Sequence, residues 1–280
     1  MDDAGDERWI SVAGITTRWS AGQGAGRPLV LINGLGANIE MWRPLRRALA
    51  PRRTVAFDAP GTGRSPTPAT PLTLAQLAGL VSGSLDRLGL HEIDLLGYSF
   101  GGAVAQLVAR RDRTRVKRLI LAGSTSGWGS FSIHPFALAG LATPARYYLG
   151  RRGDRLSRLA FGDGRRATFR NLDAARSALP PSTLGYWWQL LAIAPWSSHG
   201  WLNQLPQPTL VLVGDRDRAA PAANSRFLAE RIPNARLCVV RGAGHLLLMT
   251  DDVSAVAASI DEFLTDRDPV DQPDRALAAR

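Results

Sequence analysis

The stretch Leu95–Gly102, which reads LLGYSFGG, decides the fold of this 280-residue chain. The apolar residues before it predict a short buried strand, and the apolar stripe of residues 103–109 predicts a helix. Gly97 and Gly101 flank Ser99, as a strained corner without room for side chains requires. The pattern Gly-x-Ser-x-Gly between strand and helix predicts a nucleophile elbow, which presents the Ser99 hydroxyl above the carboxyl-terminal edge of a parallel sheet.

Two further side chains that a nucleophilic serine needs follow it along the chain. His245 comes after Gly244, just past an apolar strand, and is placed to act as the general base. Asp215 and Asp217 both follow the apolar strand 208–213, so either carboxylate could orient the histidine. The order Ser, Asp, His predicts a catalytic triad.

Strands and helices alternate on both sides of the elbow. The continuous apolar runs 29–32, 54–57 and 118–122 are typical of strands that are buried on both faces of a parallel sheet. Helical segments separate these runs, which predicts an α/β fold with parallel crossover connections.

The alternation stops in residues 124–205, which are rich in aromatic side chains and proline. An insertion at this point would lie at the carboxyl-terminal edge of the sheet, so we expect a helical cap over the active site. The core is then formed by residues 1–123 and 206–265. The polar, proline-containing residues 266–280 are expected to form a flexible tail.

The composition limits which classes of partner and which cellular compartment we expect for this protein. The net charge is +10, and Lys117 is the only lysine among the 34 basic residues, which are spread along the chain without a nucleic-acid signature. The single cysteine, Cys238, excludes an internal disulfide. The acidic N-terminus lacks the pattern of a signal peptide, and no stretch has the ~20 apolar residues of a membrane span. We therefore expect a cytoplasmic protein without a transmembrane segment or nucleic-acid partner.

Over residues 29–264 the motifs resemble those of the α/β-hydrolase superfamily with an inserted cap. Within it, the segments 31–38 (LINGLGAN), 186–190 (YWWQL), 207–212 (QPTLVL) and 231–235 (RIPNA) resemble the intracellular depolymerases of medium-chain poly(3-hydroxyalkanoate). The resemblance implies a mostly parallel eight-stranded sheet flanked by helices, with a helical cap.

The resemblance also implies roles for individual residues. In this superfamily the oxyanion hole is formed by backbone N–H groups that correspond to Leu35 and Phe100 here. The superfamily spacing Gly-x-x-Asp, with a proline four residues later, favours Asp217 over Asp215 as the triad acid. Three further positions are expected to contact the substrate: Asn33, Trp187 and Trp188.

The expected activity is ester hydrolysis by Ser99 through an acyl-enzyme, without a metal or cofactor. The resemblance implies a poly(3-hydroxyalkanoate) substrate, presented on cytoplasmic granules whose surface is the expected partner. A general carboxylesterase or lipase acting on soluble acyl esters is the main alternative. A non-catalytic binding or granule-associated protein with a hydrolase fold is the alternative from another class.

Overall fold

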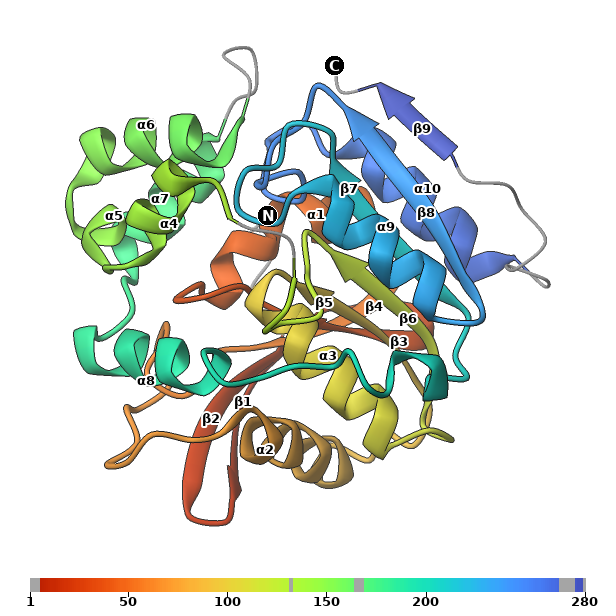
Figure 1. Ribbon diagram of the computed structural model, residues 1–280. Coiled ribbons are helices and arrows are strands. Elements are labelled where there is room, and N and C mark those ends of the chain that lie inside the picture. The colour runs from red at the N-terminus through yellow and green to blue at the C-terminus, as the bar shows by residue number, and fades with distance from the viewer. Residues whose placement is uncertain (1–5, 131–132, 164–168, 267–274, 279–280) are drawn as a thin grey trace.

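The computed structural model describes residues 6–130, 133–163, 169–266 and 275–278. Within these residues one sheet forms the centre of the molecule, with strand order β1-β2-β4-β3-β5-β6-β7-β8-β9 (Figure 1). β2 runs antiparallel to both of its neighbours, and all other neighbouring strands are parallel. The strands are β1 (Asp6–Val12), β2 (Ile15–Ala21), β3 (Ala25–Ile32), β4 (Arg52–Phe57), β5 (Ile93–Tyr98), β6 (Val116–Ala122), β7 (Thr209–Gly214), β8 (Ala235–Arg241) and β9 (Arg275–Ala278). The expected mostly parallel α/β sheet is confirmed.

The ninth strand adds to the eight that were expected. β9 pairs in parallel with β8 through residues 275–278, which belong to the segment 266–280 expected as a flexible tail. The other residues of that segment, apart from Asp266, lie outside the described part of the chain. This strand is only four residues long (RALA), which is too short for an alternating apolar pattern to reveal it.

Helices cover both faces of the sheet. α1 (Arg43–Ala48) and α10 (Ser254–Thr265) pack against each other behind the sheet in Figure 1. α2 (Leu74–Arg87) and α3 (Phe100–Arg111) pack against each other in front, and α9 (Ala222–Arg231) contacts β7 and β8. The central strands β5 and β7 are buried along their whole length, as expected for a sheet between two helical layers.

A group of helices follows β6 and precedes β7 in the chain. It falls within residues 124–205, where a cap is expected (Figure 1). Its core contains buried aromatic rings, among them Tyr147, Phe161 and Tyr186, whereas Trp128 is 78% exposed. No helix in the described ranges is long and apolar enough to cross a membrane. The cap helices are α4 (Pro135–Leu141), α5 (Ala145–Tyr148), α6 (Gly150–Phe161), α7 (Arg170–Ala178) and α8 (Thr183–Ile193).

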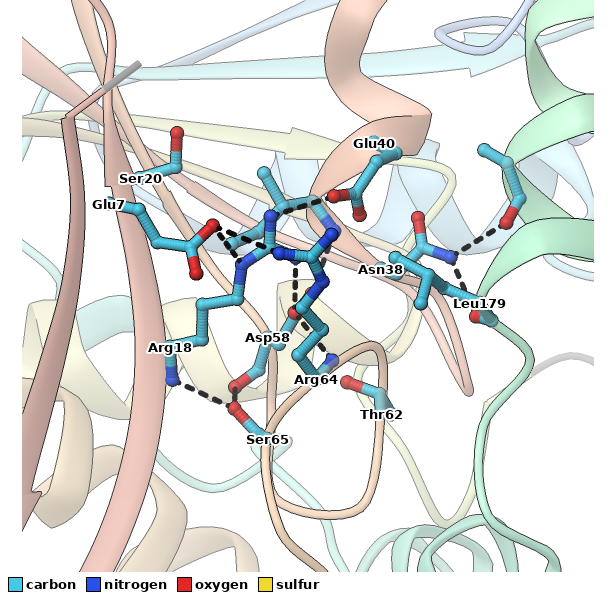
Figure 2. Close-up of polar contacts among 12 residues, drawn as sticks. Glu7, Arg18, Ser20, Asn38, Glu40, Asp58, Thr62, Arg64, Ser65 and Leu179 are labelled. Atoms are coloured by element: carbon cyan, nitrogen blue, oxygen red, sulfur yellow. Dashed lines mark hydrogen bonds and ion pairs between the residues drawn. The ribbon is translucent and has the colours of Figure 1, made fainter. Parts of the chain in front are cut away.

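A buried cluster of charges ties the loop after β4 to the N-terminal strands (Figure 2). Asp58 accepts hydrogen bonds from the backbone N–H groups of Ile39 at 2.8 Å and Arg64 at 3.0 Å, and from Arg18 Nη1 at 3.0 Å. Arg18 also donates to Glu40 at 2.7 Å. Burial raises the pKa of Asp58 to about 6, against the lowering effect of these backbone donors and of Arg18. Asp58 therefore has a structural role, in holding this loop against β2 and the segment around Ile39.

Replacing Arg18 by Met should lower the free energy of unfolding by about 3 kcal/mol at pH 8, because it leaves buried carboxylates without their cation. The loss should be smaller at pH 5, below the pKa of Asp58, where that carboxyl is protonated and carries no charge. Urea unfolding at both pH values measures the difference. Arg64→Met is the matched control: its side chain is 54% exposed, so a loss below about 0.5 kcal/mol is expected. An equal loss for Arg18→Met at both pH values would contradict this account.

Candidate active site

Ser99 lies at a strained corner between β5 and α3. Its φ is 54° and its ψ is −118°, a backbone conformation that residues with a side chain rarely adopt. The corner is possible because its neighbours are glycines. A Cβ on Gly101 would lie 2.2 Å from the backbone oxygen of Ile32, and one on Gly97 would lie 2.5 Å from the Cβ of Ala105. The Gly-x-Ser-x-Gly pattern therefore reflects a close approach of the elbow to β3 and α3.

Ser99, His245 and Asp217 form one chain of hydrogen bonds. His245 Nε2 lies 2.9 Å from Ser99 Oγ, and His245 Nδ1 lies 2.8 Å from Asp217 Oδ2. The second carboxylate oxygen of Asp217 accepts the backbone N–H groups of Ala219 at 2.9 Å and Ala220 at 2.8 Å. With a proton on Nδ1, the imidazole can accept a proton from the serine through Nε2.

The structure brings Asp217, and not Asp215, to the histidine. The side chain of Asp217 is fully buried, whereas Asp215 is exposed. Asp215 Oδ1 accepts the backbone N–H of Gly242 at 2.7 Å. Asp215 thus stabilises the turn after β8.

Two residues that sequence reasoning missed hold His245 in place. The Tyr98 hydroxyl donates to the backbone oxygen of His245 at 2.9 Å, and the backbone N–H of His245 donates to the carbonyl of Phe161 at 3.0 Å. Both rings flank the imidazole, with centroid distances of 5.3 and 5.5 Å. Tyr98 precedes the serine inside the elbow motif, but Phe161 comes from the cap, and no local pattern links it to the histidine.

A small cavity of about 30 Å³ adjoins Ser99 and His245. Gly34 and Leu35 line it from the core, and a Cβ on Gly34 would lie 3.4 Å from the Cβ of Ser99. Phe100 is the first residue of α3 and follows the serine directly. The two expected oxyanion donors thus belong to segments that flank Ser99. The cap contributes further lining residues: Leu141, Arg146, Tyr147, Phe161, Leu172 and Arg176.

The three residues expected to contact substrate lie elsewhere. Asn33 is buried and donates to the backbone oxygen of Asn38 at 2.6 Å, which closes the loop after β3. Trp187 is 44% exposed, and Trp188 Nε1 donates to the carbonyl of Pro68 at 3.2 Å. These three side chains do not line the cavity beside Ser99.

A second carboxylate, Asp163, packs close to the histidine from the cap. Its Oδ1 accepts the backbone N–H of Leu246 at 3.2 Å. A Cβ on Gly244 would lie 2.5 Å from the backbone nitrogen of Asp163, so the cap lies directly on the loop that carries His245. Burial raises the pKa of Asp163 to about 7, although nearby His245 lowers it.

The described ranges contain no group of three or more His, Cys, Asp or Glu side chains placed to hold a metal ion. Ser99, His245 and Asp217 can transfer protons and form a covalent bond to a carbonyl carbon with the groups they already carry.

Comparisons with known proteins agree with this geometry. A family model described as alpha/beta hydrolase fold matches residues 27–252. A poly(3-hydroxyalkanoate) depolymerase of Ectopseudomonas oleovorans is 40% identical over 239 residues, which cover 85% of this chain and 84% of that protein. A 2-hydroxymuconate semialdehyde hydrolase of a Pseudomonas species is 31% identical over 280 residues, covering 93% and 94% of the two chains.

Solved structures of hydrolases also resemble this chain over most of its length. A hydrolase from Pseudomonas aeruginosa superimposes with a TM-score of 0.77 at 25% identity, covering 94% of this chain and all of that one. A thermophilic esterase from Thermogutta terrifontis has a TM-score of 0.73 at 27% identity and covers 92% and 98% of the two chains. The similarity therefore extends over the core and the cap.

Replacing Asp163 by Asn should stabilise the protein at pH 8 by about 1–2 kcal/mol. The folded pKa of about 7 exceeds the ordinary value of 3.8, so the wild type loses stability as the pH rises from about 4 to about 7. The amide keeps an oxygen for the N–H of Leu246 but does not ionise. Urea unfolding between pH 4 and 8 should show a stability difference that grows with pH and levels off above pH 7. A difference that is constant over this range would contradict the assignment.

Proposed function

Because this chain belongs to the α/β hydrolase fold family, we propose that it is a serine hydrolase that cleaves carboxylic esters through an acyl-enzyme. The single observation that carries this proposal is the hydrogen-bonded chain from Ser99 through His245 to Asp217, with the serine at a strained elbow. Strained backbone of this kind marks functional sites, and here it presents a hydroxyl that is hydrogen-bonded to a base.

In the first half of the proposed reaction Ser99 Oγ attacks the ester carbonyl while His245 Nε2 takes its proton. Asp217 keeps the other imidazole proton on Nδ1 and stabilises the imidazolium that forms. The N–H groups of Leu35 and Phe100 donate to the oxyanion of the tetrahedral intermediate. The intermediate collapses when the C–O bond to the alcohol breaks, and His245 gives its proton to that leaving oxygen.

In the second half a water molecule hydrolyses the acyl-enzyme. His245 takes a proton from the water as its oxygen attacks the acyl carbon. The second tetrahedral intermediate releases the acid, and His245 returns the proton to Ser99 Oγ. The net reaction consumes one water molecule and produces one acid and one alcohol.

For the substrate we propose a polyester of 3-hydroxy fatty acids. The 40% identity to the depolymerase of Ectopseudomonas oleovorans supports this class. A second observation agrees with it: Phe136, Leu149 and Leu159 of the cap are each more than half exposed and line a cavity of about 500 Å³. An apolar face of this kind suits a water-insoluble chain better than a small soluble ester. We therefore propose that the protein acts in the cytoplasm at the surface of polyester granules.

The decisive experiment compares wild type with Ser99→Ala on two substrates, amorphous medium-chain polyhydroxyalkanoate granules and p-nitrophenyl octanoate. We expect serine-dependent release of 3-hydroxy acids from the granules as well as hydrolysis of the soluble ester. Hydrolysis of the soluble ester alone would identify a general esterase and reject the polymer. No Ser99-dependent turnover of either substrate would reject the enzyme assignment in favour of a binding protein.

The role of Asp217 has its own test. Asp217→Asn should lower kcat for p-nitrophenyl octanoate by about 10⁴-fold, because an amide favours the wrong imidazole tautomer. Asp215→Asn is the matched control, since it makes the same change two residues away at a turn that does not contact His245. We expect the control to keep kcat within about threefold. Equal losses for the two variants would contradict the assignment.

A further inference from the structure

One peptide unit beside Ser99 is held at both ends by side chains of the cap. The carbonyl of Leu35 accepts hydrogen bonds from Tyr147 Oη at 2.7 Å and from Arg146 Nη2 at 3.0 Å. The N–H of the next residue, Gly36, donates to Gln189 Oε1 at 2.9 Å. Tyr147 and Arg146 belong to α5 and Gln189 belongs to α8, so two separate cap helices fix the plane of the Leu35–Gly36 peptide.

The cap side chains that make these bonds are themselves held in place. Arg146, Tyr147 and Gln189 are all buried, with exposed fractions of 8%, 4% and 4%. Arg146 Nη1 also donates to the carbonyl of Gly140 at 3.0 Å and to the hydroxyl of Tyr186. A buried guanidinium with this many partners has few alternative orientations, so it holds the Leu35 carbonyl firmly.

Gly36 allows the cap to approach this closely. Its φ is 72°, and a Cβ there would lie 2.8 Å from Cδ2 of Tyr186 and 2.9 Å from Cε2 of Tyr147. A larger residue would be strained and would push the cap rings away from the loop. The glycine therefore belongs to the contact between core and cap.

Contacts outside the cap hold the two ends of this loop, and a backbone hydrogen bond from the N–H of Ala37 to the carbonyl of Gly34 at 3.1 Å closes its turn. Asn33 donates to the carbonyl of Asn38, and the N–H of Ile39 donates to Asp58 at 2.8 Å. Asn38 in turn donates to the carbonyls of Ala175 at 3.0 Å and Leu179 at 2.8 Å, at the end of α7 (Figure 2). Within this turn, the cap side chains bond the central peptide, at the carbonyl of Leu35 and the N–H of Gly36.

From this geometry we infer that the cap orients the oxyanion hole, with Gln189 and Tyr147 as positioning residues for the N–H of Leu35. The inference rests on the proposed serine hydrolase function. The N–H of Leu35 belongs to the preceding peptide, which shares the Leu35 Cα with the fixed one, so a displacement of the fixed peptide that moves this Cα also moves the N–H away from the oxyanion. Donors to an oxyanion act at 2.7–3.1 Å, and loss of one costs about 10²–10³ in kcat. A donor that is present but misplaced should cost less.

The test uses Gln189→Met and Tyr147→Phe, with Tyr148→Phe as the matched control. Gln189→Met removes the acceptor for the Gly36 N–H at nearly constant volume, and Tyr147→Phe removes one of two donors to Leu35. The control loses the same hydroxyl from the adjacent residue, whose bond to the carbonyl of Pro181 stays within the cap. We expect kcat for p-nitrophenyl octanoate to fall about 10- to 100-fold in Gln189→Met and about 3- to 10-fold in Tyr147→Phe. KM and the apparent pKa of the rate profile should stay as in wild type, and the control should keep the wild-type kcat.

A pair of inhibitors separates positioning of the hole from binding of the substrate. 1,1,1-Trifluorodecan-2-one forms a hemiketal with the serine and places an oxyanion in the hole, whereas decan-2-one occupies the same pocket without that charge. The variants should lose affinity for the trifluoromethyl ketone by the same factor as kcat and keep their affinity for the methyl ketone. Urea unfolding checks that each variant is folded. If Gln189→Met does not fold, Tyr147→Phe still tests the inference, because this change removes only one oxygen atom.

Three outcomes would overturn the inference. Unchanged kcat and trifluoromethyl ketone affinity in both variants would show that the cap does not orient the hole. Equal weakening of both ketones with a raised KM would show a substrate-binding role instead. A comparable loss in Tyr148→Phe would show a general disturbance of the cap. Absence of Ser99-dependent turnover in the wild type is a separate result, which rejects the proposed function itself and this inference with it.

Discussion

The active site depends on the close approach of α3 to the end of β3. At Gly101 the two backbones are so near that a Cβ would lie 2.2 Å from the carbonyl oxygen of Ile32. This contact turns the chain sharply after β5 and holds Ser99 at positive φ. It also brings the serine next to the loop that follows β3. One steric constraint thus places the proposed nucleophile and the proposed oxyanion donors side by side.

Around this corner the remaining groups are positioned by strand ends and by the cap. β7 and β8 are parallel neighbours, so the loops that follow them bring Asp217 and His245 to the same edge of the sheet as Ser99. The cap then contacts each part of the site: Phe161 accepts the N–H of His245, Asp163 accepts that of Leu246, and α5 and α8 hold the loop after β3. Most of these contacts involve backbone groups of the core, which fixes the loops as well as the side chains.

The sequence is sufficient to predict those residues whose roles follow from a local sequence pattern. Glycines beside Ser99, a histidine after a glycine at a strand end, and apolar runs of strand length each constrain the backbone on their own. The stretch YWWQL is a case in which a local pattern does not identify the residues that make the contacts. The tryptophans of this stretch were expected to contact the substrate, but it is Gln189 that bonds the loop after β3 and Tyr186 that bonds Arg146, while Trp188 bonds the carbonyl of Pro68. Helical residues point in directions about 100° apart, so the choice among neighbours is made by tertiary packing. Arg146 and Asp163 were not predicted for a related reason: the backbone groups of the active-site loops that they bond, at Leu35 and Leu246, are more than 80 residues away in the chain.

The glycine at position 36 has a consequence for how such a protein can change over generations. Here the loop beside the serine is shaped to receive particular rings and a particular amide from the cap. A transplanted cap without those partners would leave a buried carbonyl and a buried N–H unsatisfied. Recombination at the cap boundaries is therefore restricted to donors that carry matching contacts, and the inserted segment and the core must evolve together.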